Sequence, residues 1–172
     1  MAVIENVGVV RLGGFEGSNP EILDIYPPLD TTLDKEEAAA FIVKSMPHGV
    51  VPGTFTLDKL RSTYILSYTF SLPADHEGVR DDLASISVVV SDKKVNIDQF
   101  EHLFKEIIKT FNGDLLKLTK TRLTNMLERI YNGVNNNKKI KVDNVAIDVS
   151  GIIKKQKLNI RKKDLKEFKG AF

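Results

Sequence analysis

Alternating hydrophobic and polar positions predict five β-strands in the first half of the chain. Such alternation turns every second side chain toward one face of a sheet, and β-branched and aromatic residues favour this geometry. Glycine, proline and polar clusters bound each run, as is typical of turns. The expected strands cover residues 3–12, 21–26, 54–59, 62–72 and 83–90.

The apolar pattern also predicts where two of these strands lie in a sheet. Residues 83–90 alternate at first and become wholly apolar toward Val90. A strand covered on both faces needs apolar side chains on both, so we expect this strand at the centre of the sheet. The first two strands, separated by a loop, are expected to pair as an antiparallel hairpin.

A first helix is expected between the second and third strands. Ala38, Phe41, Ile42 and Ser45 follow helical spacing. Thr31 or Thr32 can cap its start, and acidic residues in the first turn favour the positive end of the helix dipole. Pro47 is expected to end it.

Two amphipathic helices are predicted after the last strand. Asn96 is expected to cap the first, with an apolar stripe from Phe100 to Phe111 and an end at Asn112-Gly113. The second is expected from about residue 114 to 131, ending at Asn132-Gly133. The order β-β-α-β-β-β-α-α predicts an α+β fold, a five-stranded antiparallel sheet covered by helices.

The C-terminal part of the chain has a different character. Residues 3–132 are expected to form the folded domain, residues 133–139 an Asn- and Lys-rich linker, and residues 140–172 a basic extension. Within the extension, residues 140–149 alternate like one strand, which we expect to join a sheet edge or to pack at a partner surface. Residues 154–169 are expected to form a short surface helix or to stay flexible.

Composition and charge restrict the function classes. The 172 residues are 42% hydrophobic and 28% charged, which suits a folded domain. The net charge of +2 hides an asymmetry, since residues 138–172 hold 11 Lys and Arg against 4 Asp and Glu, and residues 1–137 hold 14 against 19. Without cysteine, disulfides, thiol nucleophiles, iron–sulfur clusters and cysteine-based zinc sites are excluded. No apolar run is long enough to span a membrane. The first apolar run has no basic region before it, so we expect no signal peptide and a cytoplasmic protein.

The sequence contains no recognisable catalytic, cofactor-binding or metal-binding motif. Glycine-rich phosphate loops and the GxSxG elbow are absent. His48, His76 and His102 are far apart, and we expect them in solvated or boundary positions. The acidic pairs Asp81-Asp82 and Glu36-Glu37 are adjacent in sequence only, and neighbours on a helix do not face one another. We therefore predict no catalytic residue, no cofactor and no metal.

The basic extension is the one candidate for contact with an anionic surface. Its charges suit a membrane periphery or a protein partner, or they are solvated or docked on the domain itself. Nucleic acid is a poor fit, because aromatic side chains for base stacking are scarce and the rest of the chain is acidic. The residues concerned are Lys154, Lys155, Lys157, Arg161, Lys162 and Lys163.

Several apolar segments resemble longin-like domains, of the type found at the N-terminus of DENN-family and related small-GTPase regulators. Residues 21–29 (EILDIYPPL) are similar to a second strand that ends in a Tyr-Pro-Pro step. Residues 63–70 are similar to the core strands that follow, and residues 80–90, leading into 100–111, to the last strand and its helix. The resemblance covers about residues 3–132, and the Ile-, Asn- and Lys-rich style suits an archaeal lineage.

The resemblance implies a non-enzymatic interaction module linked to membrane trafficking. Its partner would be a small GTPase or another longin-like subunit, and it would also allow a homodimer. We find no further DENN segments and no coiled-coil heptads after residue 132, so we expect a scaffold or subunit and not a complete exchange factor or a membrane-fusion protein. Tyr26, Pro27 and Pro28 are the structural signature of the resemblance, although a buried tyrosine and a strand stop also account for them.

Two other functions fit the same pattern of elements. A profilin-like actin-binding protein has a comparable layered architecture, but profilins begin with a helix and use exposed aromatics, whereas this chain begins with a strand and has no Trp. An enzyme on an α+β scaffold would need a deep polar pocket with titratable groups.

Overall fold

A computed structural model describes residues 4–13, 18–29, 35–72, 80–91, 96–111, 120–136, 138–142 and 145–147. These residues form a five-stranded antiparallel sheet, three helices and a separate two-stranded sheet. The predicted α+β class with an antiparallel five-stranded sheet is therefore confirmed.

The main sheet places its last strand at the centre. Its strands are β1 (Ile4–Leu12), β2 (Glu21–Tyr26), β3 (Phe55–Leu60), β4 (Thr63–Leu72) and β5 (Asp82–Val90), in the spatial order β2-β1-β5-β4-β3. Every residue of β5 except Leu83 is buried. The expected central position of this strand and the antiparallel hairpin of the first two strands are both confirmed.

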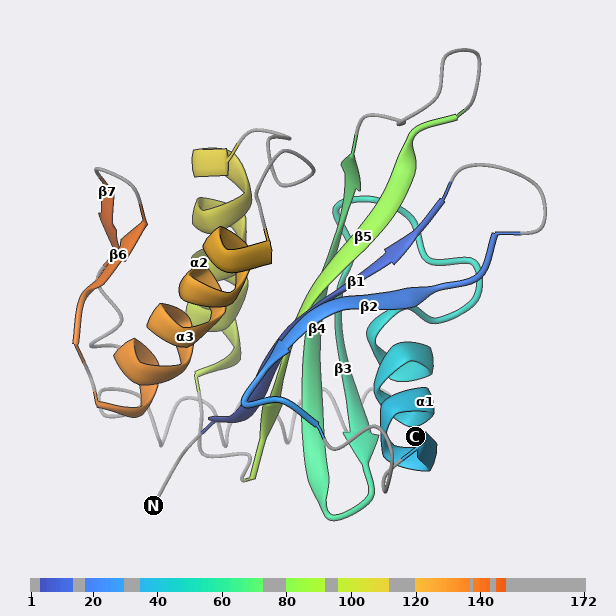
Figure 1. Cartoon of the computed structure of the whole chain (residues 1–172), viewed down its shortest axis with the longest axis horizontal. Coiled ribbons are helices and arrows are strands. Elements are labelled where there is room, and N and C mark those ends of the chain that lie inside the picture. Colours follow the sequence, from blue (N-terminus) through green and yellow to red (C-terminus); the bar gives the residue numbers. More distant parts are fainter. Residues whose placement is uncertain are drawn as a thin grey trace.

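Helices cover both faces of the sheet (Figure 1). α1 (Lys35–Ser45) lies on one face, and α2 (Ile97–Phe111) and α3 (Lys120–Asn135) lie on the other. Each face has its own core. The core under α1 includes Val10, Phe41, Leu60, Ile65 and Val89, and the larger core under α2 and α3 includes Leu66, Ile86, Val88, Phe100, Phe104, Leu127 and Ile130.

Small side chains bring α1 close to the centre of the sheet. The buried hydroxyls of Ser67 and Ser87, on β4 and β5, lie 2.7 Å apart and share a hydrogen bond. The Ser85 hydroxyl donates to the Ser45 carbonyl oxygen in the last turn of α1 at 2.7 Å. The hydroxyls of Ser67, Ser85 and Ser87 are therefore hydrogen-bonded, whereas the buried Ser45 hydroxyl has no partner among the described residues.

The expected start of α2 is confirmed, and the expected end of α3 is wrong. The Gln99 N–H donates to Asn96 Oδ1 at 3.2 Å, which is the predicted N-cap bond. α3 continues through Asn132-Gly133 to Asn135, so residues 133–135 of the expected linker are helical. The expected caps Thr31 and Thr32 and the expected α2 stop at residues 112–113 lie outside the described residues.

The single strand expected over residues 140–149 is replaced by two short ones. β6 (Ile140–Val142) and β7 (Val145–Ile147) pair with each other as a separate antiparallel sheet, not with an edge of the main sheet. Ile140 is fully buried in the core under α2 and α3. The segment therefore pairs with itself, while Ile140 anchors it to the helices.

Candidate functional site

The outer side of β3 is an open edge of the main sheet. β3 pairs with β4 in an unbroken register from Phe55↔Tyr68 to Leu60↔Thr63. Within the described ranges, no strand pairs with its other side. An open strand presents unpaired N–H and C=O groups, to which a strand of another chain can bind.

The backbone groups of β3 alternate between β4 and the open side. Just before the strand, the Thr69 N–H donates to the Thr54 carbonyl oxygen at 3.0 Å. Antiparallel partners bond at every second residue, so the even-numbered positions direct their backbone groups to β4. The odd-numbered Phe55, Leu57 and Lys59 therefore direct theirs outward, where the Lys59 N–H donates to Asp58 Oδ1 at 2.7 Å.

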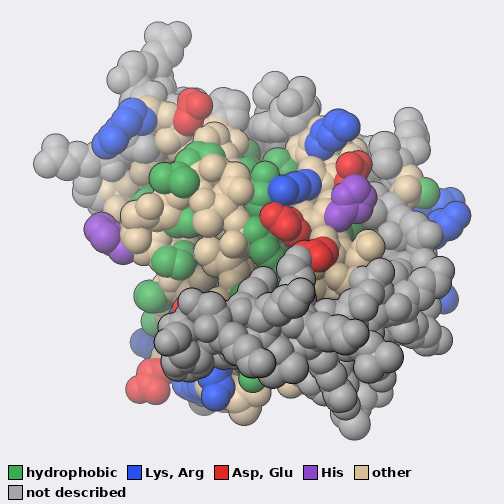
Figure 2. All heavy atoms as spheres, turned by 180° about the vertical axis from the view of Figure 1, so that it is seen from behind, with side chains coloured by type: hydrophobic (Ala, Val, Ile, Leu, Met, Phe, Trp, Pro, Cys, Tyr) green, Lys and Arg blue, Asp and Glu red, His purple; other side chains and the backbone are tan. Residues whose placement is uncertain are grey.

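The side chains around this edge combine apolar and charged groups. On the α2 side, Leu57 is 37% exposed, an unusual position for a leucine in the middle of a regular strand. On the α1 side, Lys44 Nζ lies 3.1 Å from Asp58 Oδ2. Val43 on α1 and Val51 in the loop before β3 are also exposed. Figure 2 shows hydrophobic side chains interspersed with charges of both signs on the side turned away in Figure 1.

β2, at the opposite edge, is protected. Its register with β1 shifts within the strand, and Pro20 and Pro27 flank it. α3 lies over its face, with the Thr124 hydroxyl donating to the Asp24 carboxylate. Bulges, prolines and covering helices are common protection of an edge strand, and β3 has none of them within its six residues. Its own protection is limited to the charged pair Asp58 and Lys59 near its end, where Asp58 Oδ1 accepts the Lys59 N–H.

The Tyr26-Pro27-Pro28 step ends β2 beneath α3. The Tyr26 ring meets the Tyr131 ring edge-on, with 5.3 Å between centroids. The Asn6 side-chain amide donates to the Pro27 carbonyl oxygen at 2.9 Å, and the Tyr26-Pro27 peptide bond is cis. These contacts account for the step by packing, and its value as a family signature stays a prediction.

The Tyr26 phenol has a perturbed acidity. Burial beside α3, together with the Glu128 carboxylate and Tyr131, raises the pKa of the Tyr26 phenol above its ordinary value near 10. The phenol donates a hydrogen bond to Glu128. The phenol is therefore protonated, and a hydrogen-bond donor, throughout the physiological range.

A pocket of about 240 Å³ lies between α1, the start of β1 and the β3–β4 turn. Phe41, Leu60 and Val89 contribute apolar surface, and Glu37 and Arg61 contribute charge. Arg61 occupies the left-handed region at φ 57°, as the tight turn after β3 requires. The pocket is small beside ordinary ligand sites of about 300–1,000 Å³.

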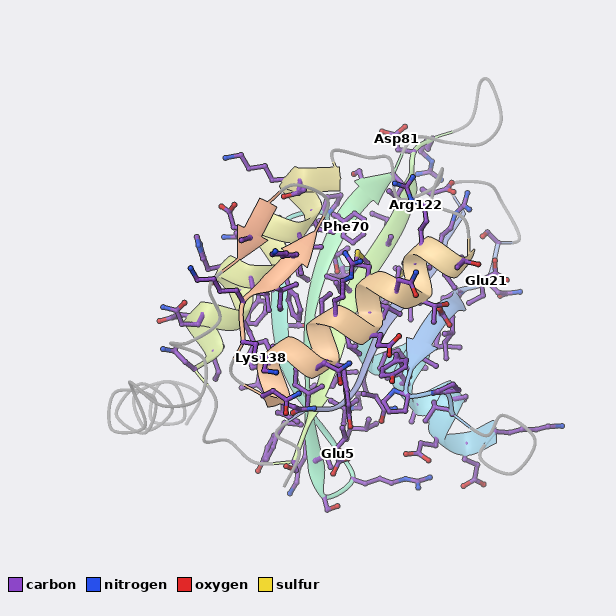
Figure 3. The ribbon with its side chains drawn as sticks, turned by 60° about the vertical axis from the view of Figure 1, so that its left-hand side comes forward. Glu5, Glu21, Phe70, Asp81, Arg122 and Lys138 are labelled. Atoms are coloured by element: carbon purple, nitrogen blue, oxygen red, sulfur yellow. The ribbon has the colours of Figure 1, made fainter. Side chains whose placement is uncertain are left out.

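The described residues offer no metal centre. No group of three His, Asp or Glu side chains in the described ranges is placed to hold an ion. His48 and His102 are exposed, and His76 lies outside the described residues. The labelled charged side chains are spread around the molecule, with Glu5 and Asp81 at opposite ends of the sheet (Figure 3).

One polar contact was not expected from the sequence. Arg11 Nε on β1 donates to Asp82 Oδ2 on β5 at 2.7 Å, and the Asp82 side chain is 5% exposed. Asp82 was considered only as part of the Asp81-Asp82 pair. The signal in the sequence is an arginine that directly follows the apolar run Val9-Val10 within the strand, since a partly buried guanidinium needs a charged partner.

The basic candidate residues lie outside the described residues. This applies to Lys154, Lys155, Lys157, Arg161, Lys162 and Lys163. Their expected contact with an anionic surface stays a prediction. Among the helices of the described ranges, none combines the length and hydropathy that crossing a bilayer requires.

Neither a comparison with protein-family models nor a search of curated proteins found a match for this chain.

Proposed function

We propose that this chain is a non-catalytic, longin-like interaction module of a small-GTPase-regulating complex. The observation that carries the proposal is the open, regular edge of β3. The resemblance of residues 21–29, 63–70 and 80–90 to longin-like segments supports the choice of family. The arrangement of one helix on one face and two on the other, around the order β2-β1-β5-β4-β3, is compatible with it.

The contrast between the two edges supports binding through β3. β2 is shielded by its register shift, its flanking prolines and α3, whereas β3 has six regular ladder pairs and an exposed leucine. Strand addition draws affinity from main-chain hydrogen bonds and specificity from the side chains along the edge. The partner we propose is a small GTPase or another longin-like subunit, in membrane trafficking. The basic residues of the extension would add contact with an anionic membrane.

A proline scan of β3 tests the proposal. The Leu57 N–H points outward, so Leu57→Pro removes a donor from the open edge and leaves the ladder with β4 intact. The Thr56 N–H points to β4, so Thr56→Pro breaks the ladder and serves as the destabilised reference.

The measurement is the solution mass by light scattering, alone and with a candidate GTPase loaded with GDP or GTP. We expect the wild-type chain to form a complex that Leu57→Pro abolishes, at nearly unchanged thermal stability. A wild-type chain that stays monomeric and binds neither nucleotide form would contradict the proposal, and so would full binding by Leu57→Pro.

A further inference from the structure

We propose that β3 pairs with β3 of a second copy of this chain, antiparallel, about a two-fold axis that passes through Leu57. The inference rests on the proposed use of the β3 edge and names its occupant. It follows from the register, backbone directions and charges of the strand.

Symmetry leaves few registers for such a pair. When two sheets join into one about a two-fold axis, opposed residues lie on the same face, because side chains alternate along a strand. Each odd-numbered position then opposes an odd-numbered one, and each even-numbered position an even-numbered one. In a strand that runs from Phe55 to Leu60, only the registers centred on Leu57 and on Asp58 overlap five of the six residues.

Hydrogen bonding favours the register centred on Leu57. In that register Leu57 opposes Leu57 of the second copy, and Phe55 opposes its Lys59. All three residues direct their backbone groups outward, but the Lys59 N–H already donates to Asp58 Oδ1 at 2.7 Å. While that contact lasts, the opposed pairs exchange about four hydrogen bonds in total. In the register centred on Asp58, the Phe55 groups find no partner within the strand, and on the same basis the number falls to about two.

Charge favours the same register. Centring on Leu57 places Asp58 opposite Thr56 of the second copy, and Asp58 keeps its ion pair with Lys44 at 3.1 Å. It also places the Lys59 side chain of one copy beside the Phe55 ring of the other, so that the ammonium group can lie against the ring in a favourable cation–π contact. Centring on Asp58 would oppose two aspartates across the axis, and directly opposed like charges destabilise a sheet.

The apolar surface is self-complementary in this arrangement. Leu57, 37% exposed in the single chain, would pack against its own symmetry mate on the α2 side. A two-fold contact uses the same patch on both copies, so one exposed leucine on the axis serves both. Joining two β3 edges also removes the open edge from each copy.

The absence of cysteine from the chain makes the register directly measurable. Opposed residues that exchange hydrogen bonds have Cα atoms about 5.5 Å apart, which suits a disulfide. Leu57→Cys therefore reports the proposed register and Asp58→Cys the competing one. Thr56→Cys is a negative control, because in both registers the two side chains at position 56 are not opposite each other. Val51→Cys, at a position that is 61% exposed, measures random collision.

We expect Leu57→Cys to form a disulfide-linked dimer under mild oxidation at least about tenfold faster than Val51→Cys, because pairing raises the effective concentration of the thiols. Faster linkage of Asp58→Cys would overturn the register. Linkage of every variant at the Val51→Cys rate would overturn self-pairing.

Sedimentation of the wild-type chain tests the inference without depending on whether a cysteine variant folds. The wild-type chain should sediment as a dimer and Leu57→Pro as a monomer, and a monomeric wild-type chain overturns the inference. If the wild-type chain captures a GTPase through an edge that Leu57→Pro blocks, while no self-linkage occurs, the self-pairing fails and the proposed function stands.

Discussion

Ile140 occupies the space that a side chain at Gly133 would need. A Cβ at Gly133 would lie 2.4 Å from Ile140 Cγ1, well inside van der Waals contact. The Lys138 N–H donates to the Gly133 carbonyl oxygen at 2.8 Å and turns the chain back toward α3. The glycine is therefore the point on the helix where the β6–β7 segment docks.

Gly133→Ala should destabilise the protein by about 1–3 kcal/mol through overpacking. At an open helical position the same change would stabilise by up to about 1 kcal/mol, so the sign is diagnostic. The measurement is the free energy of unfolding in urea. In an Ile140→Ala background the clash is absent, and Gly133→Ala should then be neutral or stabilising. The same cost in both backgrounds would show that Ile140 does not pack there.

Gly8→Ala should also destabilise, because α1 packs against β1 at this residue. A Cβ there would lie 2.9 Å from Phe41 Cζ and 3.1 Å from the Asp24 carbonyl oxygen. We expect a loss of about 1–3 kcal/mol in thermal or urea unfolding. Phe41→Leu should relieve only part of it, since the Asp24 backbone cannot move aside. An unchanged stability for Gly8→Ala would refute this packing.

The raised pKa of Tyr26 should make stability fall at alkaline pH. The folded chain holds the phenol proton more tightly than the unfolded chain, so this contribution is complete below about pH 10 and is lost as pH rises through the folded pKa. Wild-type unfolding free energy should therefore decrease more than that of Tyr26→Phe between pH 8 and pH 11. Glu128→Gln should lower the pKa, as read by tyrosinate absorbance. Parallel pH profiles for wild type and Tyr26→Phe would exclude the effect.

Removing Asp82 should be among the costlier single substitutions. Asp82→Ala leaves the largely buried Arg11 guanidinium without this carboxylate, and we expect a loss of about 2–4 kcal/mol. The matched control is Glu101→Ala, whose partner Lys105 is 52% exposed and whose loss should stay within about 0.5 kcal/mol. Chemical denaturation of both variants provides the comparison. Similar small losses would show that the Arg11–Asp82 pair is solvated.

Local patterns predicted the elements of this protein well. The alternation in residues 83–90 and their apolar end indicated a central strand, which β5 is. Asn96 was predicted as a cap because asparagine is favoured just before a helix, where its side chain can bond to a backbone group three residues away. The structure has this bond, to the Gln99 N–H. Such signals depend on spacing along the chain, and spacing is what a sequence records.

The candidate site was only partly predictable. A five-stranded antiparallel sheet was expected, but nothing in the alternation of residues 54–59 distinguishes an edge strand from an inner one. Which edge stays open depends on α3 lying over β2, a contact between segments far apart in sequence.

The amino-acid sequence by itself determined the number, type and order of the main elements, because propensity and periodicity act within a few residues. Only the tertiary structure decided that β3 is open and β2 shielded, that Arg11 meets Asp82, and that Gly133 receives Ile140. Each of these is a contact between residues separated along the chain, and such contacts exist only once the layers have packed.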